Sequence, residues 1–206
     1  MSGSPEPWRL QLLVPADRSL YPRVEAALAG GVTLVQLREK HRPDRETYEV
    51  GRELRDIVRR HGAAFFLDDR VDLALALGAD GVHLGQADLP LDAARRLAPG
   101  LLIGVSCHDL LQVRAAQGAD YIGFGPVFPT PSKDDADAPT GLSALREAVG
   151  ASRRPVVAIG GVEVRSAADV RAAGAAGAAV IHAVLDAADA EEAARALLRA
   201  LGAEES

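Results

Sequence analysis

Short apolar runs alternate along this chain with longer stretches whose apolar residues recur at helical spacing. Most runs are rich in Val, Ile, Leu or Phe and are bounded by Gly, Pro or Asp, a pattern typical of strands buried in a parallel sheet. Eight segments fit this description: Leu10–Val14, Thr33–Leu37, Ala64–Leu67, Gly81–Leu84, Leu102–Val105, Tyr121–Phe124, Val156–Ile159 and Ala178–His182. The stretches between them, such as Arg45–Arg60 and Ala190–Leu201, predict helices.

Eight strands that alternate with helices predict parallel pairing through right-handed crossovers. We therefore predict an α/β protein, a single-domain (β/α)₈ TIM barrel over residues 1–206, at the small end of that class. Roughly residues 1–8 and 203–206 are expected to be flexible termini. A doubly wound open sheet with five or six strands is the alternative. The eight-fold count and the Gly160-Gly161 pair after the seventh run favour the barrel.

In such barrels the chemistry gathers at the carboxyl ends of the strands. The residues at or just beyond those ends are Gln36, Arg38, Lys40, Asp68, Asp69, Asp88, Ser106, Thr130, Ser132, Lys133, Gly160 and Gly161. The opposite ends carry the repeated turns Gly78-Ala79-Asp80 and Gly118-Ala119-Asp120. We interpret these turns as structural joints between helix and strand, without a chemical role.

Charge and composition restrict the partners of the protein. The formal net charge of -6 argues against nucleic acid, because duplex binding requires a basic face. No run of 18 apolar residues predicts a membrane span, and the first residues lack the features of a secretory signal. The single cysteine, Cys107, excludes an internal disulfide and fits a reducing compartment, so we predict a cytoplasmic protein. The sequence is compatible with a homo-oligomer.

Two aspartates follow neighbouring predicted strands. Asp69 follows the third strand and Asp88 the fourth, so the two carboxylates can share one hard cation. Magnesium prefers such oxygen ligands, typically one or two carboxylates completed by substrate phosphates and water. The alternative is that Asp68 or Asp69 caps the helix predicted at Val71–Leu77. We expect one of the two to cap and the other to remain free for a ligand.

Positive charge at the same end of the barrel indicates an anion site. Of the 23 basic residues only Lys40 and Lys133 are lysines, and each follows an apolar run. Lysine is a compact point charge whereas arginine is a planar fork, so the two are not equivalent where an anion is held. With Arg38 and a metal, the two lysines would form a clamp for a diphosphate. Gly161, in the loop after the seventh strand, predicts a phosphate cup formed with the loop after the eighth.

Several kinds of catalytic signature are missing from the sequence. It contains no nucleophile elbow, no Ser/His/Asp order and no nucleotide-binding glycine fingerprint. We interpret His83 as a hydrogen-bonded core histidine and Cys107 as a small buried apolar residue. Ser106 and His108 lie at the end of the fifth strand and remain candidates for a role in the site.

Five segments of the chain resemble the thiamine-phosphate synthase family, which shares its barrel with thiazole tautomerases. They are Gln36-Leu37-Arg38-Glu39-Lys40, Asp69-Arg70-Val71-Asp72-Leu73-Ala74, Gly81-Val82-His83-Leu84-Gly85-Gln86-Ala87-Asp88, Gly104-Val105-Ser106 and Gly123-Phe124-Gly125-Pro126-Val127-Phe128-Pro129-Thr130. The resemblance implies a transferase that condenses 4-amino-5-hydroxymethyl-2-methylpyrimidine diphosphate with a thiazole phosphate. The products would be thiamine phosphate and pyrophosphate, formed by a magnesium-assisted dissociative displacement.

The resemblance also implies roles for individual residues. Asp69 and Asp88 would be the magnesium ligands. The pyrimidine diphosphate or its pyrophosphate would contact Gln36, Arg38, Lys40, Asp68, Ser106 and Lys133, of which Arg38, Ser106 and Lys133 are the expected catalytic residues. The thiazole phosphate would contact Thr130, Ser132, the backbone of Gly161, and His182.

Three positions depart from the family pattern. Ser132 is a mild departure, because it still offers a hydroxyl where threonine or serine is usual. Asp68 stands where asparagine is common, and its extra carboxylate would either strengthen metal binding or repel the diphosphate. His182 stands where a small hydroxyl residue is common, and it would either crowd the phosphate or donate to it. Two other functions stay open. The first is a tautomerase-like isomerase, for which we expect histidine where this chain has Pro126. The second is a non-catalytic regulator that binds a thiazole phosphate.

Overall fold

The structure, a computed structural model, describes residues 7–130 and 138–202. Its parallel strands pair in chain order, and the last pairs with the first to close a barrel. The strands are β1 (Leu10–Val14), β2 (Leu34–Leu37), β3 (Ala64–Asp68), β4 (Gly81–Leu84), β5 (Leu102–Cys107), β6 (Tyr121–Phe124), β7 (Val156–Ala158) and β8 (Gly177–Val180). The predicted (β/α)₈ barrel is therefore confirmed, and the open-sheet alternative is wrong.

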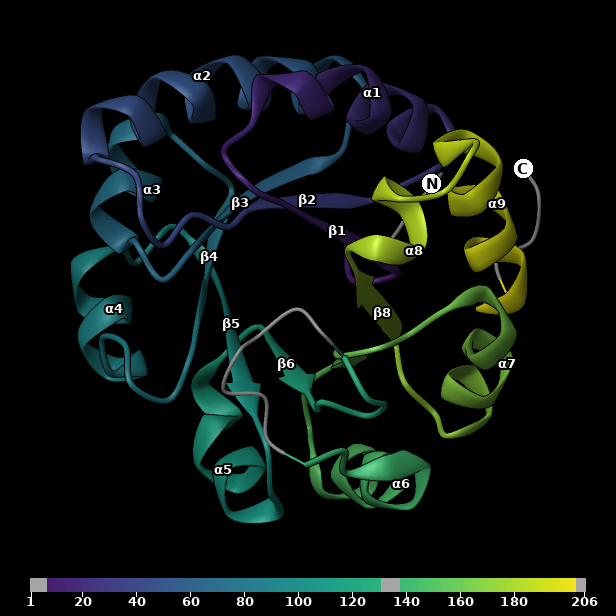
Figure 1. The fold of residues 1–206 in the computed structure, drawn as a ribbon. Helices are drawn as coiled ribbons and strands as arrows, with labels where there is room; N and C mark the ends of the chain where they lie inside the picture. The colour runs from purple at the N-terminus through teal and green to yellow at the C-terminus, as the bar shows by residue number, and fades with distance from the viewer. Residues whose placement is uncertain (1–6, 131–137, 203–206) are drawn as a thin grey trace, which may run out of the picture.

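Helices surround the barrel on its outer side (Figure 1). They are α1 (Tyr21–Ala29), α2 (Asp44–Arg60), α3 (Val71–Leu77), α4 (Leu91–Leu97), α5 (Leu110–Ala115), α6 (Gly141–Ala151), α7 (Val164–Ala172), α8 (His182–Leu185) and α9 (Ala190–Ala200), with 3₁₀ turns at Arg18–Leu20 and Ala116–Gly118. In α2, the buried residues Val50, Leu54 and Val58 are four positions apart, so they form one stripe that packs on the barrel. In the described part of the chain, no helix is both long and apolar enough to cross a membrane.

Two predicted boundaries are wrong in ways that affect the site. The strand predicted at Ala178–His182 ends at Val180, and His182 is the first residue of α8. The apolar run continues through Ile181, but the backbone of that residue (φ -126°, ψ -80°) has left the extended conformation. Asp68 is the last residue of β3, one position beyond the predicted strand.

The start of the ordered chain also differs from the prediction. Trp8, expected to belong to a flexible terminus, is buried at the end of the barrel opposite the strand carboxyl ends. Its ring stacks on Tyr121 with 4.6 Å between ring centroids, and it meets Phe66 edge to face at 6.4 Å. Aromatic pairs with these geometries are favourable beyond the area they bury. Trp8 therefore closes the amino-terminal end of the barrel.

The Gly-Ala-Asp turns are structural joints, as predicted. The carboxylate of Asp80 accepts the backbone N–H of Phe65 at 2.8 Å, and that of Asp120 accepts the N–H of Ile103 at 2.7 Å. Each aspartate thus precedes one strand and satisfies a donor at the start of the neighbouring strand, where the ladder has not yet begun. Asp120 also pairs with Arg95 at 2.6 Å. These turns lie at the barrel end opposite the candidate site.

Candidate active site

Two acidic side chains meet at the carboxyl end of the barrel. Asp69 follows β3 and Asp88 follows β4, and their carboxyl groups share a hydrogen bond. Burial, the charge of Asp68 and the hydrogen bond with Asp88 together raise the pKa of Asp69 to about 6. Burial would raise the pKa of Asp88 as well, but the hydrogen bonds from Asp69 and from the Gly85 N–H, at 2.7 Å, lower it. The pair therefore retains a proton more readily than two separated carboxylates do.

The backbone aims Asp69 into this site. Its φ of 60° lies in the left-handed region, and it is the only residue other than glycine with this property in the described part of the chain. Its N–H donates to the His83 carbonyl of β4 at 2.8 Å, which holds the turn against the neighbouring strand. The expectation that Asp68 or Asp69 caps α3 is wrong, because Arg70 is the N-cap residue and makes no side-chain cap.

Two cations that follow β2 lie against Asp68 and Asp69. Lys40 Nζ is 3.1 Å from Asp68 Oδ2 and also contacts Asp69 Oδ2, and Arg38 Nε is 3.5 Å from Asp68. Burial alone would lower the pKa of Lys40, but the hydrogen bond to Asp69 and the charge of Asp68 raise it. Asp68, whose side chain is only 9% exposed, therefore faces both cations. Asp68 anchors both Arg38 and Lys40.

The β2 loop that carries Lys40 is organised by Glu39, which sequence reasoning missed. One oxygen of its carboxylate accepts the backbone N–H groups of Lys40, His41 and Arg42 at 2.8–3.1 Å. Arg42 also pairs with Glu39 at 3.4 Å. A carboxylate surrounded by successive N–H groups fixes a tight loop. The signal for it in the sequence was the acidic residue between Arg38 and Lys40.

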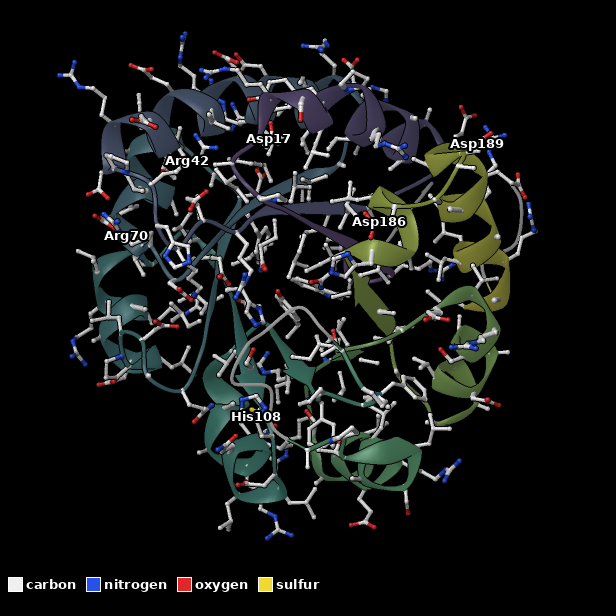
Figure 2. The ribbon with its side chains drawn as sticks, viewed as in Figure 1. Asp17, Arg42, Arg70, His108, Asp186 and Asp189 are labelled. Atoms are coloured by element: carbon white, nitrogen blue, oxygen red, sulfur yellow. The ribbon has the colours of Figure 1, made fainter. Side chains whose placement is uncertain are left out.

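A second arginine ties the neighbouring loops together. Arg70 bonds Asp44 at the start of α2 through both carboxylate oxygens, at 2.6 and 2.8 Å, and also pairs with Asp72 of α3 at 2.7 Å. Arg42 and Arg70 lie on the same side of the barrel, close to α2 and α3 (Figure 2). The loops that present Lys40 and Asp69 are thus joined outside the site itself.

The donor set suits a magnesium ion shared with a phosphorylated ligand. Asp69 and Asp88 offer oxygen donors after adjacent strands, and burial together with the charge of Asp68 raises the pKa of Asp69. Among the described residues, no three acidic, histidine or cysteine side chains form a metal site by themselves. Magnesium often takes one or two carboxylates and completes its shell with water and phosphate oxygens. The residues therefore fit this cation.

Ser106 lies on β5, and both its side chain and its carbonyl are held by hydrogen bonds. Its side chain is buried, with Oγ 2.8 Å from Nε2 of His83, and its carbonyl accepts Gln86 Nε2 at 2.6 Å. Gln86, which sequence reasoning also missed, thereby links the β4 loop to β5. Gln36 is buried on β2, two residues before Arg38. His83 is a hydrogen-bonded core histidine, as predicted.

The loops after β6 and β7 pack together at the Gly160-Gly161 turn, for which a phosphate cup with the loop after β8 was predicted. Val127 N donates to Ile159 O at 2.9 Å, and Phe128 N donates to Gly160 O at 3.1 Å. This pairing brings half-buried Thr130 toward the Gly160-Gly161 turn. The N–H groups of these two glycines make no backbone hydrogen bond with another described residue. Ser132 and Lys133 lie outside the described residues.

Two further histidines and the cysteine are held by other contacts. The His182 side chain turns to Asp186, the C-cap residue of α8, 2.8 Å away. Asp186 lies across the barrel mouth from Arg70 (Figure 2). His108 Nδ1 is 2.5 Å from the carbonyl of Gly125. Burial raises the pKa of the Cys107 thiol to about 12, which fits a buried apolar role rather than a nucleophile.

Comparison with known proteins agrees with this geometry. The sequence pattern of the family described as thiamine monophosphate synthase matches residues 10–184. A thiamine-phosphate synthase of Chloroflexus aurantiacus is 50% identical over 196 residues, which cover 92% of this chain and 91% of the relative. One from Pyrococcus horikoshii is 45% identical over 196 residues, which cover 93% and 94%.

A solved structure extends the similarity to three dimensions. Thiamine phosphate pyrophosphorylase from Pyrococcus furiosus superposes with a TM-score of 0.86 at 42% sequence identity, covering 95% of this chain and 96% of the other. These relatives give no support to the tautomerase-like or regulator alternatives. The chain belongs to the thiamine monophosphate synthase family.

Proposed function

We propose that this protein is a transferase that joins 4-amino-5-hydroxymethyl-2-methylpyrimidine diphosphate to a thiazole phosphate and releases pyrophosphate. The observation that carries the proposal is the cluster at the ends of β2, β3 and β4. Lys40 contacts Asp69 of the Asp69–Asp88 pair there, and Arg38 pairs with the adjacent Asp68, within a chain of this family. Such a cluster is suited to a diphosphate that leaves as an anion.

The pyrimidine half-site would be built on this cluster. Asp69 and Asp88 would hold Mg²⁺, whose charge would stabilise the departing pyrophosphate. Arg38 and Lys40, now paired with Asp68, would turn from that carboxylate to phosphate oxygens when the diphosphate binds. Both cations are partly exposed, so they can change partner without unfolding the loop. Ser106 would contact the same substrate from β5, and Gln36 from β2.

The chemistry asks mainly for positioning and charge stabilisation. A thiazole ring nitrogen carries its own lone pair and needs no base to attack the pyrimidine methylene. The developing charges are the pyrophosphate anion and the cation-like methylene, and preorganised donors act most strongly on such charges. The thiazole phosphate would bind Thr130, Ser132 and the backbone of Gly161. His182 is also proposed for this half-site, after release from Asp186.

A pyrophosphate-release assay with both substrates tests the proposal. We expect release that depends on both substrates together and on magnesium, and that stops when a chelator is added. The joined product should appear in equal amount to pyrophosphate. Binding of the thiazole phosphate without release would instead support a non-catalytic protein, and conversion of a thiazole isomer without magnesium would support the isomerase.

Lys133→Met is expected to raise the KM for the pyrimidine diphosphate by roughly 10-fold or more, because a charge-assisted contact to a phosphate is worth about 1.5–3 kcal/mol. The KM for the thiazole phosphate should change little. Steady-state rates at varied concentrations of each substrate measure the two effects separately. If the thiazole phosphate suffers the larger loss, Lys133 belongs to the other half-site.

A further inference from the structure

A column of buried polar side chains runs through the interior of the barrel beneath Ser106. His83, on β4, lies between Tyr121 of β6 and Ser106 of β5: its Nδ1 is 2.6 Å from the Tyr121 hydroxyl, and its Nε2 is 2.8 Å from Ser106 Oγ. All three side chains are buried. The function proposed above gives a role to Ser106 alone, so the two groups below it have no assignment.

The barrel is shaped around this column. His83, Gly104 and Tyr121 are register partners on β4, β5 and β6. A Cβ on Gly104 would lie 2.2 Å from the Tyr121 ring and 2.6 Å from Nδ1 of His83. On the layer above, Gly123 is the partner of Ser106, and a Cβ there would lie 3.0 Å from Cε1 of His83. The neighbouring strands therefore carry glycine where the His83 and Tyr121 rings lie.

The surroundings of Tyr121 favour one direction of hydrogen bonding. Burial raises the pKa of Tyr121 well above its ordinary value, so the phenol keeps its proton. In the described part of the chain, the hydrogen-bond partner of the hydroxyl is His83 Nδ1, at 2.6 Å, and a buried hydroxyl proton requires an acceptor. The phenol therefore directs its proton to His83 Nδ1. A neutral imidazole has one donor and one acceptor nitrogen, so the His83 proton is then on Nε2.

This arrangement has a consequence for the serine hydroxyl. Nε2–H of His83 donates to Ser106 Oγ, which occupies a lone pair of the oxygen and leaves the hydroxyl proton for another partner. Gln86 holds the Ser106 carbonyl from the β4 loop at 2.6 Å. The position of Ser106 and the direction of its hydroxyl proton are therefore both fixed. A hydroxyl that directs its proton away from His83 suits the acceptor oxygens of a diphosphate.

We propose that His83 is a positioning residue, held by Tyr121 in its Nε2-protonated form, and that it makes Ser106 a hydrogen-bond donor to the pyrimidine diphosphate. The part concerning the diphosphate rests on the proposed function. The part concerning the tautomer does not, so the two parts are tested separately. The opposing possibility is that His83 and Tyr121 only fill the barrel.

Nitrogen NMR tests the tautomer on the unmodified protein. In protein labelled with ¹⁵N-histidine, the His83 signals are assigned by their loss in His83→Gln. We expect a protonated Nε2 and an unprotonated Nδ1 at neutral pH. The proton on Nδ1, or an imidazolium with both nitrogens protonated, would overturn the proposal whatever the enzyme does.

A double-mutant cycle tests the role in catalysis. Tyr121→Phe keeps the ring and removes the hydroxyl, and we expect kcat/KM for the pyrimidine diphosphate to fall roughly 10-fold, as for loss of one positioned hydrogen bond. Ser106→Ala should cost roughly 10²-fold, the low end for loss of an oriented donor. In the Ser106→Ala background, Tyr121→Phe should have no further effect. Effects that multiply, or an unchanged rate in Tyr121→Phe, would leave only a packing role.

Two further variants separate positioning from stability. Tyr21→Phe removes a phenol hydrogen bond to Val50 O, remote from the site, and should lower thermal stability without changing kcat/KM. His83→Gln can place an amide donor toward Ser106, so it should retain more activity than His83→Leu at a comparable melting temperature. Equal loss in both His83 variants would contradict the proposal. A wild-type protein that releases no pyrophosphate would remove the proposed function and leave the NMR result standing.

Discussion

Asp69→Asn is expected to lower the rate of pyrophosphate release by roughly 10²–10³-fold, because a metal ligand supplies several kcal/mol of charge stabilisation. The magnesium concentration that gives half-maximal rate should rise. Asparagine tolerates the left-handed φ of 60° at this position, and its N–H can still donate to the His83 carbonyl. The substitution therefore removes charge and leaves the turn in place. Rates measured across a magnesium series give both quantities.

The Asp69→Asn substitution should raise thermal stability even though it lowers activity. The pKa of Asp69 is raised to about 6 in the folded protein, above its ordinary value of 3.8. The folded state therefore holds this proton more tightly, and its stability falls as pH rises from about 4 to about 6. Above that range the ionised carboxylate is unfavourable, because it is buried beside the charge of Asp68. Asp69→Asn should then melt at a higher temperature than the wild type at pH 8 in the presence of a chelator.

A matched control separates the site from the general effect of the substitution. Asp92→Asn makes the same change in an exposed ion pair with Arg96 on α4, with a side chain that is 72% exposed. It should leave both the rate and the magnesium dependence unchanged, because exposed pairs contribute little. Wild-type turnover and magnesium dependence in Asp69→Asn would remove Asp69 from the proposed cation site.

The barrel was predictable because its signal is repeated. Each strand is an apolar run ended by a residue that breaks the run, and eight such runs leave few topologies open. The error at His182 arose where this signal is missing. Ile181 continues the apolar run, and only the backbone conformation shows that the strand has ended. Trp8 was misplaced for a related reason, since an isolated aromatic residue has no periodicity.

The sequence was sufficient to predict where the candidate site lies, but not which side chains contact one another in it. Adjacent strand ends bring Asp69 and Asp88 together in any such barrel, and the structure places them in contact. Sequence could not show that Asp68 holds Arg38 and Lys40, because side-chain direction in a loop depends on its local hydrogen bonds. Ser132 and Lys133 remain predictions from the sequence.

Gly161→Ala is expected to weaken the thiazole half-site selectively. Gly161 has a φ of +66°, and a Cβ there would lie 2.4 Å from the Pro129 carbonyl and 2.8 Å from Cβ of Phe128. The loop that carries Thr130 must therefore shift away from the Gly160-Gly161 turn. Misplacement of about 1 Å can cost roughly 10²-fold in rate, so we expect the KM for the thiazole phosphate to rise roughly 10–100-fold. The KM for the pyrimidine diphosphate should remain close to that of the wild type.

Gly62→Ala is the matched control for this effect. Gly62 has a φ of +71°, and a Cβ there would meet no atom within 4 Å. Both variants carry the cost of an alanine in the left-handed region, about 1–2 kcal/mol, and both should melt at lower temperatures. Only Gly161→Ala also moves a loop of the site, because Gly62 follows α2 at the opposite end of the barrel. Equal changes in the KM for the thiazole phosphate in the two variants would mean that backbone strain, rather than the packing of the β6 and β7 loops, causes the loss.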